Sequence, residues 1–172
     1  MAKISFRNFE QYELQLAHLR ERTPEIAGKA IYAGAEIVTD AIRANIEALP
    51  AVSDKAGLIA YQKKDPAPLT ETAKKGLLDG LGITPMKDEN GFYNVKIGFD
   101  GPGGEHGYND LRTQKYPKGQ PNVLIARSLE SGSSISPKHP FVRPAINASR
   151  KRAEAKMAEV LDEEIGKIMD TD

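Results

Sequence analysis

Apolar side chains recur at the spacing of an α-helix through the first third of the chain. This spacing predicts two helices, over Phe6–Arg22 and Thr23–Leu49, because Thr23-Pro24 suits both the end of one helix and the start of the next. Asn8 is the expected N-cap of the first helix. The apolar positions are Phe9, Tyr12, Leu16 and Leu19 in the first helix, and Ala30, Ala33, Ile37, Val38, Ala41, Ile42 and Ile46 in the second.

A short helix and a β-hairpin are predicted after a stretch without periodicity. Residues 50–68 show no regular pattern, and their glycine and prolines predict a long surface loop. Thr70–Leu81 has apolar residues at helical spacing after a capping threonine, so it predicts a helix that Gly82 ends. Asn90-Gly91 is typical of a tight hairpin turn, and apolar and polar residues alternate from Tyr93 to Phe99. Antiparallel strands are therefore expected on either side of this turn.

The last third of the chain predicts a second loop and a long helix. Gly101–Pro121 is rich in glycine, proline and asparagine, which predicts the loop. Val123–Leu129 suits a strand or a short helix, and we favour the helix. The final helix is expected to begin at Pro144 and to end near Met169. Its predicted inward face is Ile146, Ala153, Met157, Val160, Leu161, Ile165 and Ile168, and its outward face is Arg150, Lys151, Arg152, Glu154, Glu159 and Glu163.

Composition narrows the classes of protein to be considered. The length of 172 residues suits one domain over residues 1–172, with residues 6–22 as an N-terminal helical arm. The formal net charge is zero, from 24 basic and 24 acidic residues, so attraction to nucleic acid or to an anionic membrane is not expected to dominate. Cysteine is absent, which excludes disulfides and thiolate chemistry. Without a signal-peptide pattern or an apolar run of about 20 residues, we expect a soluble protein that is used where it is made.

No arrangement of residues predicts catalysis, a metal or a cofactor. His18, His106 and His139 lack the spacing of metal-binding histidines on a helix, so structural or solvated roles are favoured. Gly101–Gly107 follows a strand but lacks the Lys-Ser/Thr ending of a phosphate-binding loop. The serines within residues 131–136 do not form the Gly-x-Ser-x-Gly motif of a nucleophile.

Three short basic runs leave DNA binding as an alternative. They are Lys63-Lys64, Lys74-Lys75 and Arg150-Lys151-Arg152. Such side chains bind phosphate backbones, but they also occur on any solvated surface, and we favour the second interpretation. No aromatic residues alternate with them, which argues against single-strand binding.

The early helix rich in alanine and isoleucine and four later segments, in this order and spacing, resemble a known family. The later segments are Leu69–Leu81, Gly91–Phe99, Ile125–Gly132 and Pro140–Ala145. Together they resemble the gene-product-ten-like family of small tail-component proteins, also called neck or head–tail joining proteins, of long-tailed bacteriophages and prophages. The resemblance covers most of the chain from about Thr23 onward. Lys75-Gly76-Leu77-Leu78 stands where many relatives have an Arg-Thr-Gly-x-Leu segment, so a role tied to that motif does not carry over.

The resemblance implies an α+β fold in which long N- and C-terminal helices pack on a small antiparallel β-sheet, with long loops. It implies a structural virion protein of the tail or neck, not an enzyme, assembled in the cytoplasm of the host bacterium. The subunits would form a ring, expected as a hexamer, that completes or terminates the tail tube and helps to join tail to head. The implied partners are a tail tube protein and a head-completion or adaptor protein, with double-stranded DNA passing through the ring. The alternative is a head-closure or DNA-packaging accessory protein that contacts DNA.

Ring formation by identical subunits needs two different patches on each subunit. We expect these patches in the loops 51–64 and 101–118, with the Phe141–Arg143 turn setting the angle of the last helix. The predicted interface residues are Lys55, Tyr61, Lys63, Lys64, Tyr108, Arg112, Tyr116, Phe141 and Arg143.

Overall fold

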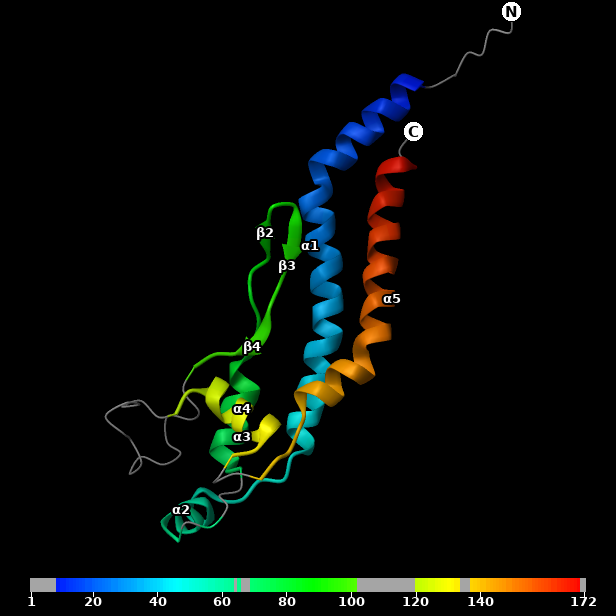
Figure 1. The fold of residues 1–172 in the computed structure, drawn as a ribbon. Helices are drawn as coiled ribbons and strands as arrows, with labels where there is room; N and C mark the ends of the chain where they lie inside the picture. Colours follow the sequence, from blue (N-terminus) through cyan, green and yellow to red (C-terminus); the bar gives the residue numbers. More distant parts are fainter. Residues whose placement is uncertain (1–8, 64, 66–68, 102–119, 134–136, 171–172) are drawn as a thin grey trace, which may run out of the picture.

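Two long helices, α1 (Phe9–Ala48) and α5 (Val142–Met169), run side by side in opposite directions (Figure 1). The computed structural model describes residues 9–63, 65, 69–101, 120–133 and 137–170. The short helices α2 (Asp54–Gln62), α3 (Glu71–Gly80) and α4 (Asn122–Ser131) gather toward the end where α1 stops and α5 begins. The expected α+β class with long terminal helices is confirmed.

The β-strands form one long hairpin beside α1 (Figure 1). Strand β1 (Leu81–Ile83) pairs antiparallel with β4 (Ile97–Phe99), and β2 (Lys87–Glu89) pairs antiparallel with β3 (Phe92–Asn94). The turn uses Asn90 with φ 59° and Gly91 with φ 86°, the positive values that a tight hairpin turn requires. The predicted hairpin is therefore confirmed, although its strands form two separate short ladders.

The predicted break at Thr23-Pro24 is wrong, because α1 continues through it. Thr23 does not act as an N-cap. Its hydroxyl instead donates to the Leu19 carbonyl, 2.9 Å away and one turn earlier. Pro24 has no N–H to offer the preceding turn, and α1 bends near this point in Figure 1. The expected arm over residues 6–22 is thus the first part of α1, while residues 6–8 lie outside the described residues.

The predicted loop over residues 50–68 contains the helix α2, which the sequence pattern did not reveal. This helix has nine residues, too few for a clear apolar stripe. Contacts from elsewhere fix its start: the Asp54 carboxylate accepts hydrogen bonds from the backbone N–H and the hydroxyl of Thr72. Tertiary contact therefore stabilises a helix that its own sequence only weakly favours. Residues 64 and 66–68 of this stretch lie outside the described residues.

Helices α3 and α4 form where the sequence predicts helices. The Thr70 hydroxyl caps α3 by accepting from the Ala73 N–H at 3.2 Å, as predicted. The helix ends at Gly80, one residue before the predicted end at Leu81, because Leu81 already pairs in β1. Residues 123–129 are helical within α4, so the favoured alternative is confirmed. The second predicted loop falls mainly on residues 102–119, which are outside the described part of the chain.

The apolar core lies where the end of α1, the start of α5 and the short helices meet. Phe141 is 1% exposed, and its ring packs edge-on against Phe99 with centroids 5.9 Å apart. The buried cluster consists of Ile42, Ile46, Leu69, Ala73, Leu77, Leu81, Ala126, Leu129, Phe141 and Ala145.

Helices α1 and α5 approach closely because small residues line their contact. A Cβ atom on Gly34 would lie 2.5 Å from Cγ of Met157, so only glycine fits there without displacement. The predicted inward face of α5 needs correction, since Ile146 and Ile165 are exposed. Small side chains lie inward instead, because they allow the helix backbones to come together. The residues of α5 that are buried are Ala145, Ser149, Ala153, Glu164 and Ile168, while the predicted outward face is exposed as expected.

Candidate assembly interface

Four of the nine predicted interface residues have side chains in the described part of the structure: Lys55, Lys63, Phe141 and Arg143. Lys55 and Lys63 are exposed at either end of α2, and Arg143 is exposed at the start of α5. No hydrogen bond or ion pair joins these three side chains within the described residues. The side chain of Tyr61 and the residues Lys64, Tyr108, Arg112 and Tyr116 lie outside the described part of the structure, so their roles stay predictions.

Phe141 is wrongly predicted as an interface residue. Its side chain fills the core between Phe99 and the surrounding helices and is not available to a partner. The error has a physical cause: the turn before α5 faces inward, because its backbone is held by a carboxylate from α4.

That carboxylate belongs to Glu130, which caps the start of α5. Its Oε2 atom accepts from the backbone N–H groups of Phe141 at 2.8 Å and Val142 at 2.9 Å, and its Oε1 accepts from the Arg143 N–H at 3.1 Å. The first N–H groups of a helix have no partner within it, so a carboxylate at this position satisfies them and complements the helix dipole. In addition, the His139 N–H donates to the Leu129 carbonyl at 2.8 Å. The segment over residues 129–132 is thus fastened to the segment over residues 139–143.

The environment of Glu130 favours its ionised form. Burial alone raises the pKa of this carboxyl, since its side chain is only 14% exposed. The hydrogen bonds from Val142, Phe141 and Arg143, with the nearby Arg143 guanidinium, outweigh burial and leave the pKa lowered. The joint between α4 and α5 therefore contains a stable negative charge. We call this joint the Glu130 cap.

Replacing Glu130 with glutamine should destabilise the fold. The amide is the same size but presents an NH₂ group and no charge to the backbone donors, so we expect a loss of about 1–3 kcal/mol in the free energy of unfolding. Urea denaturation measures it. The control is Glu159→Gln on the exposed face of α5, where we expect a change within about 0.5 kcal/mol. Equal losses in the two variants would contradict the role of the cap.

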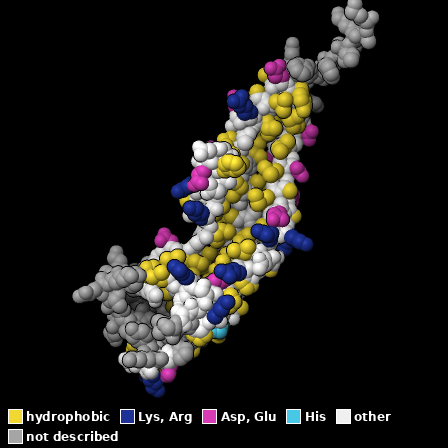
Figure 2. Space-filling model, viewed as in Figure 1, with side chains coloured by type: hydrophobic (Ala, Val, Ile, Leu, Met, Phe, Trp, Pro, Cys, Tyr) yellow, Lys and Arg dark blue, Asp and Glu magenta, His cyan; other side chains and the backbone are white. Residues whose placement is uncertain are grey.

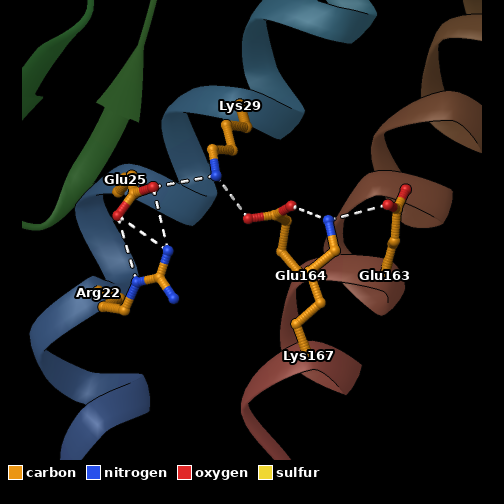
Figure 3. Close-up of polar contacts among 6 residues, drawn as sticks. All are labelled: Arg22, Glu25, Lys29, Glu163, Glu164 and Lys167. Carbon is orange, nitrogen blue, oxygen red and sulfur yellow. Dashed lines mark hydrogen bonds and ion pairs between the residues drawn. The ribbon is translucent and has the colours of Figure 1, made fainter.

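A chain of ion pairs joins α1 to α5 toward the opposite end of the pair (Figure 3). Glu164 is at its centre: its Oε2 lies 2.6 Å from Nζ of Lys29 on α1, and its Oε1 lies 2.6 Å from Nζ of Lys167. Lys29 also contacts Glu25 at 2.9 Å, and Glu25 contacts Arg22. The Glu164 side chain is 10% exposed, whereas those of its two lysine partners are about half exposed. Glu164 is thus the buried member of the only cross-helix ion pair between α1 and α5 in the described structure.

The pKa of Glu164 is lowered to about 2, chiefly by the hydrogen bond from Lys167 and then by that from Lys29, against the opposing effect of burial. Its ordinary value is 4.5. The Glu164 carboxylate binds a proton less readily in the folded state than in the unfolded chain. Its contribution to the free energy of unfolding is therefore complete above pH 4.5 and is lost as the pH falls toward 2. The same ion pairs raise the pKa of Lys29 and of Lys167, in each case mainly through the hydrogen bond to Glu164.

We therefore expect Glu164→Gln to flatten the acid limb of the stability curve. Between pH 4.5 and 2 the natural chain should lose more free energy of unfolding than the variant, because the variant has no proton to take up at this site. Urea denaturation across this range measures the slope. Glu163→Gln, which changes an exposed partner of Lys167, is the matched control. Identical slopes for Glu164→Gln and the natural chain would contradict this assignment.

Large apolar side chains stay exposed along the long helices. Figure 2 shows hydrophobic side chains in a band that follows the helix pair toward the end where α1 begins. At that end Tyr12, Leu14 and Leu16 are exposed, and at the hairpin turn Phe92 is 77% exposed. Tyr12 and Leu16 belong to the apolar stripe that the sequence predicts, but no described element covers them. Leu14 and Phe92 lie off the predicted apolar stripes, so periodicity did not select them.

A shallow hollow of ≈ 310 Å³ separates the start of α1 from the end of α5. We call it the terminal hollow. The Gln15 side chain bridges the two helices beside it by donating to the Met169 carbonyl at 3.0 Å. The residues that line the hollow are Gln11, Leu14, Gln15, His18, Arg22, Lys167 and Ile168.

Within the described residues, no group of three or more His, Cys, Asp or Glu side chains is placed to bind a metal ion. The helices of that same part include none with the length and apolar character needed to cross a membrane. Comparison with models of protein families, with curated proteins and with solved structures yields no match for this chain.

Proposed function

We propose that this chain is a structural virion protein of the phage head–tail junction, whose copies form a ring that completes or terminates the tail tube and helps to join tail to head. The observation that carries the proposal is the exposed apolar surface at two separate places, the start of α1 and the hairpin turn. A ring of identical subunits needs two different patches on each copy, and these two places meet that requirement.

The Glu130 cap supports the link to the phage family. The sequence resemblance is most specific in two segments, Leu129–Gly132 and Phe141–Ala145. The cap joins these two segments directly, because three backbone N–H groups of the second segment donate to the Glu130 carboxylate of the first. Their pairing gives a structural reason for both to occur in one protein, because together they fix where α5 begins and in which direction it runs. Such a joint suits a rigid building block.

The proposed partners are further copies of the chain, a tail tube protein and a head-completion or adaptor protein. Native mass spectrometry and electron microscopy of the purified protein, alone and with the tail tube protein, test the proposal. We expect closed rings of identical subunits. Monomers alone, even when the tail tube protein is present, would contradict it.

The basic run on α5 supports a second candidate, a head-closure or DNA-packaging accessory protein that contacts DNA. Lys151 and Arg152 are exposed and form no ion pair within the described residues, whereas Arg150 lies 3.8 Å from Glu154. Gel shifts with double-stranded DNA at increasing salt test this candidate. Binding that weakens steeply with salt and is lost in Lys151→Glu would favour it over the ring without DNA contact.

A further inference from the structure

The terminal hollow has the character of a docking site for an aromatic side chain flanked by carboxylates. Leu14, which is exposed, supplies most of its apolar surface, and Ile168, which is 7% exposed, lies beneath it. The two charged residues of its lining, Arg22 and Lys167, are both cations. Its volume of ≈ 310 Å³ exceeds the roughly 150 Å³ of a cavity that admits benzene. Both cations already pair with glutamates of the same chain. We therefore expect them to orient an incoming carboxylate more than to add to the binding energy.

The tip of the β2–β3 hairpin has the complementary chemistry. Phe92 is the most exposed large hydrophobic residue in the described structure. Beside it on the same two strands lie Asp88 and Glu89, against the single cation Lys87. Asp88 accepts a hydrogen bond from the Gly91 N–H at 2.7 Å, which constrains the turn at the tip.

The hairpin and α5 contact different sides of α1. The hydroxyl of Tyr32 on α1 accepts from the Met86 N–H at 2.7 Å and so ties the start of β2 to α1. From there the hairpin runs along α1 toward the end that contains the terminal hollow (Figure 1). Because Phe92 remains exposed, the hollow of its own subunit does not receive it. Phe92 is therefore available to the hollow of a second copy.

We propose that the hairpin tip of one copy docks in the terminal hollow of the next, with Phe92 against Leu14 and Ile168, and Glu89 beside Arg22 and Lys167. This contact is heterologous, since different surfaces of the two copies meet, and repeated contacts of this kind close into a ring when the rotation between copies permits. The inference rests on the proposed ring function and identifies the two surfaces that make the ring.

Paired cysteines test the contact, because the natural chain has none. One preparation carries Leu14→Cys and a second carries Phe92→Cys. Both positions are exposed, so the fold should tolerate either change. After mixing, assembly and mild oxidation, we expect a cross-linked dimer only when both variants are present. Val123→Cys, at an exposed position of α4, replaces Phe92→Cys in the control mixture and should give no cross-link with Leu14→Cys.

Other results would overturn the proposal. Cross-linked dimers from Leu14→Cys alone would indicate that the hollow meets its own copy, and the absence of a mixed cross-link within rings would exclude the contact. Rings seen by native mass spectrometry without the cross-link leave the proposed function standing, whereas absence of rings counts against that function itself. A second measurement uses Phe92→Asp, which should raise the concentration at which rings dissociate roughly tenfold or more. No change in that concentration would also overturn the proposal.

Discussion

Replacing Phe141 with alanine is expected to lower the free energy of unfolding by about 3–5 kcal/mol. The side chain is 1% exposed, and its ring makes an edge-on contact with Phe99. Truncation removes this contact and leaves a cavity in the apolar core. The Glu130 carboxylate of α4 holds the backbone of this turn, so the turn is not free to collapse into the space. Urea denaturation at a concentration where the protein is monomeric measures the loss.

Phe92→Ala is the matched control for this prediction. It removes the same number of atoms from a side chain that is 77% exposed, so we expect the free energy of unfolding to change by no more than about 0.5 kcal/mol. We thus expect Phe141→Ala to lower the free energy of unfolding and Phe92→Ala to affect only the contact between copies. A small loss for Phe141→Ala would contradict its place in the core and restore the sequence-based interpretation of Phe141 as an interface residue.

Replacing Gly80 with alanine should have the next largest effect, a loss of about 3 kcal/mol, at the top of the range for overpacking. A Cβ atom there would lie 2.2 Å from the carbonyl oxygen of Asp100 and 2.5 Å from Nδ2 of Asn122. Neither neighbour moves easily. The Asp100 N–H donates to the Gly80 carbonyl at 2.8 Å, and Asn122 is buried and donates to the carbonyls of Gly76 and Asp100. The methyl group would therefore separate α3 from β4 and from the start of α4.

The control for Gly80 is Gly166→Ala in α5. The closest atom to a Cβ at that position is 3.7 Å away, which is ordinary contact, and alanine is the better helix former. We therefore expect Gly166→Ala to stabilise the protein by about 0.5–1 kcal/mol, as measured by the shift of the urea midpoint. If Gly80→Ala were neutral or stabilising, the close approach of Asp100 would be disproved.

Signals that are local in the sequence predicted the structure well. Thr70 has its cap partner three residues ahead, and Asn90-Gly91 supplies its own positive φ values, so neither needs the rest of the chain. Pro24 shows the limit of such signals. It favours the start of a helix, yet α1 continues through it, with the Arg22–Glu25 pair across the site and Gln15 bonded to the end of α5. A local pair within α1 and a contact with α5 thus both favour a continuous helix at this position.

The candidate interface was harder to predict because it depends on which apolar residues remain uncovered. Helical spacing grouped Leu16 with buried positions, but α5 ends beside Gln15 and does not extend over the first turns of α1. The Glu130 cap has no local signal either, since its three donors are 11 to 13 residues further along the chain. On α5 the periodicity was correct for the outward face. For the inward face it correctly included Ala153 and Ile168 but wrongly included Ile146 and Ile165, which are exposed. It missed Ala145 and Ser149, because alanine and serine carry little hydrophobic signal.

The pairing of α1 with α5 also sets an order of events during synthesis. The ion pair between Lys29 and Glu164 joins residues 135 positions apart, so α1 leaves the ribosome long before its main partner exists. Contacts between such distant residues form late in folding, because a long loop must close first. The terminal hollow needs side chains from both helices, including Ile168 near the end of α5. A nascent chain therefore cannot form this hollow until its own α5 has been made.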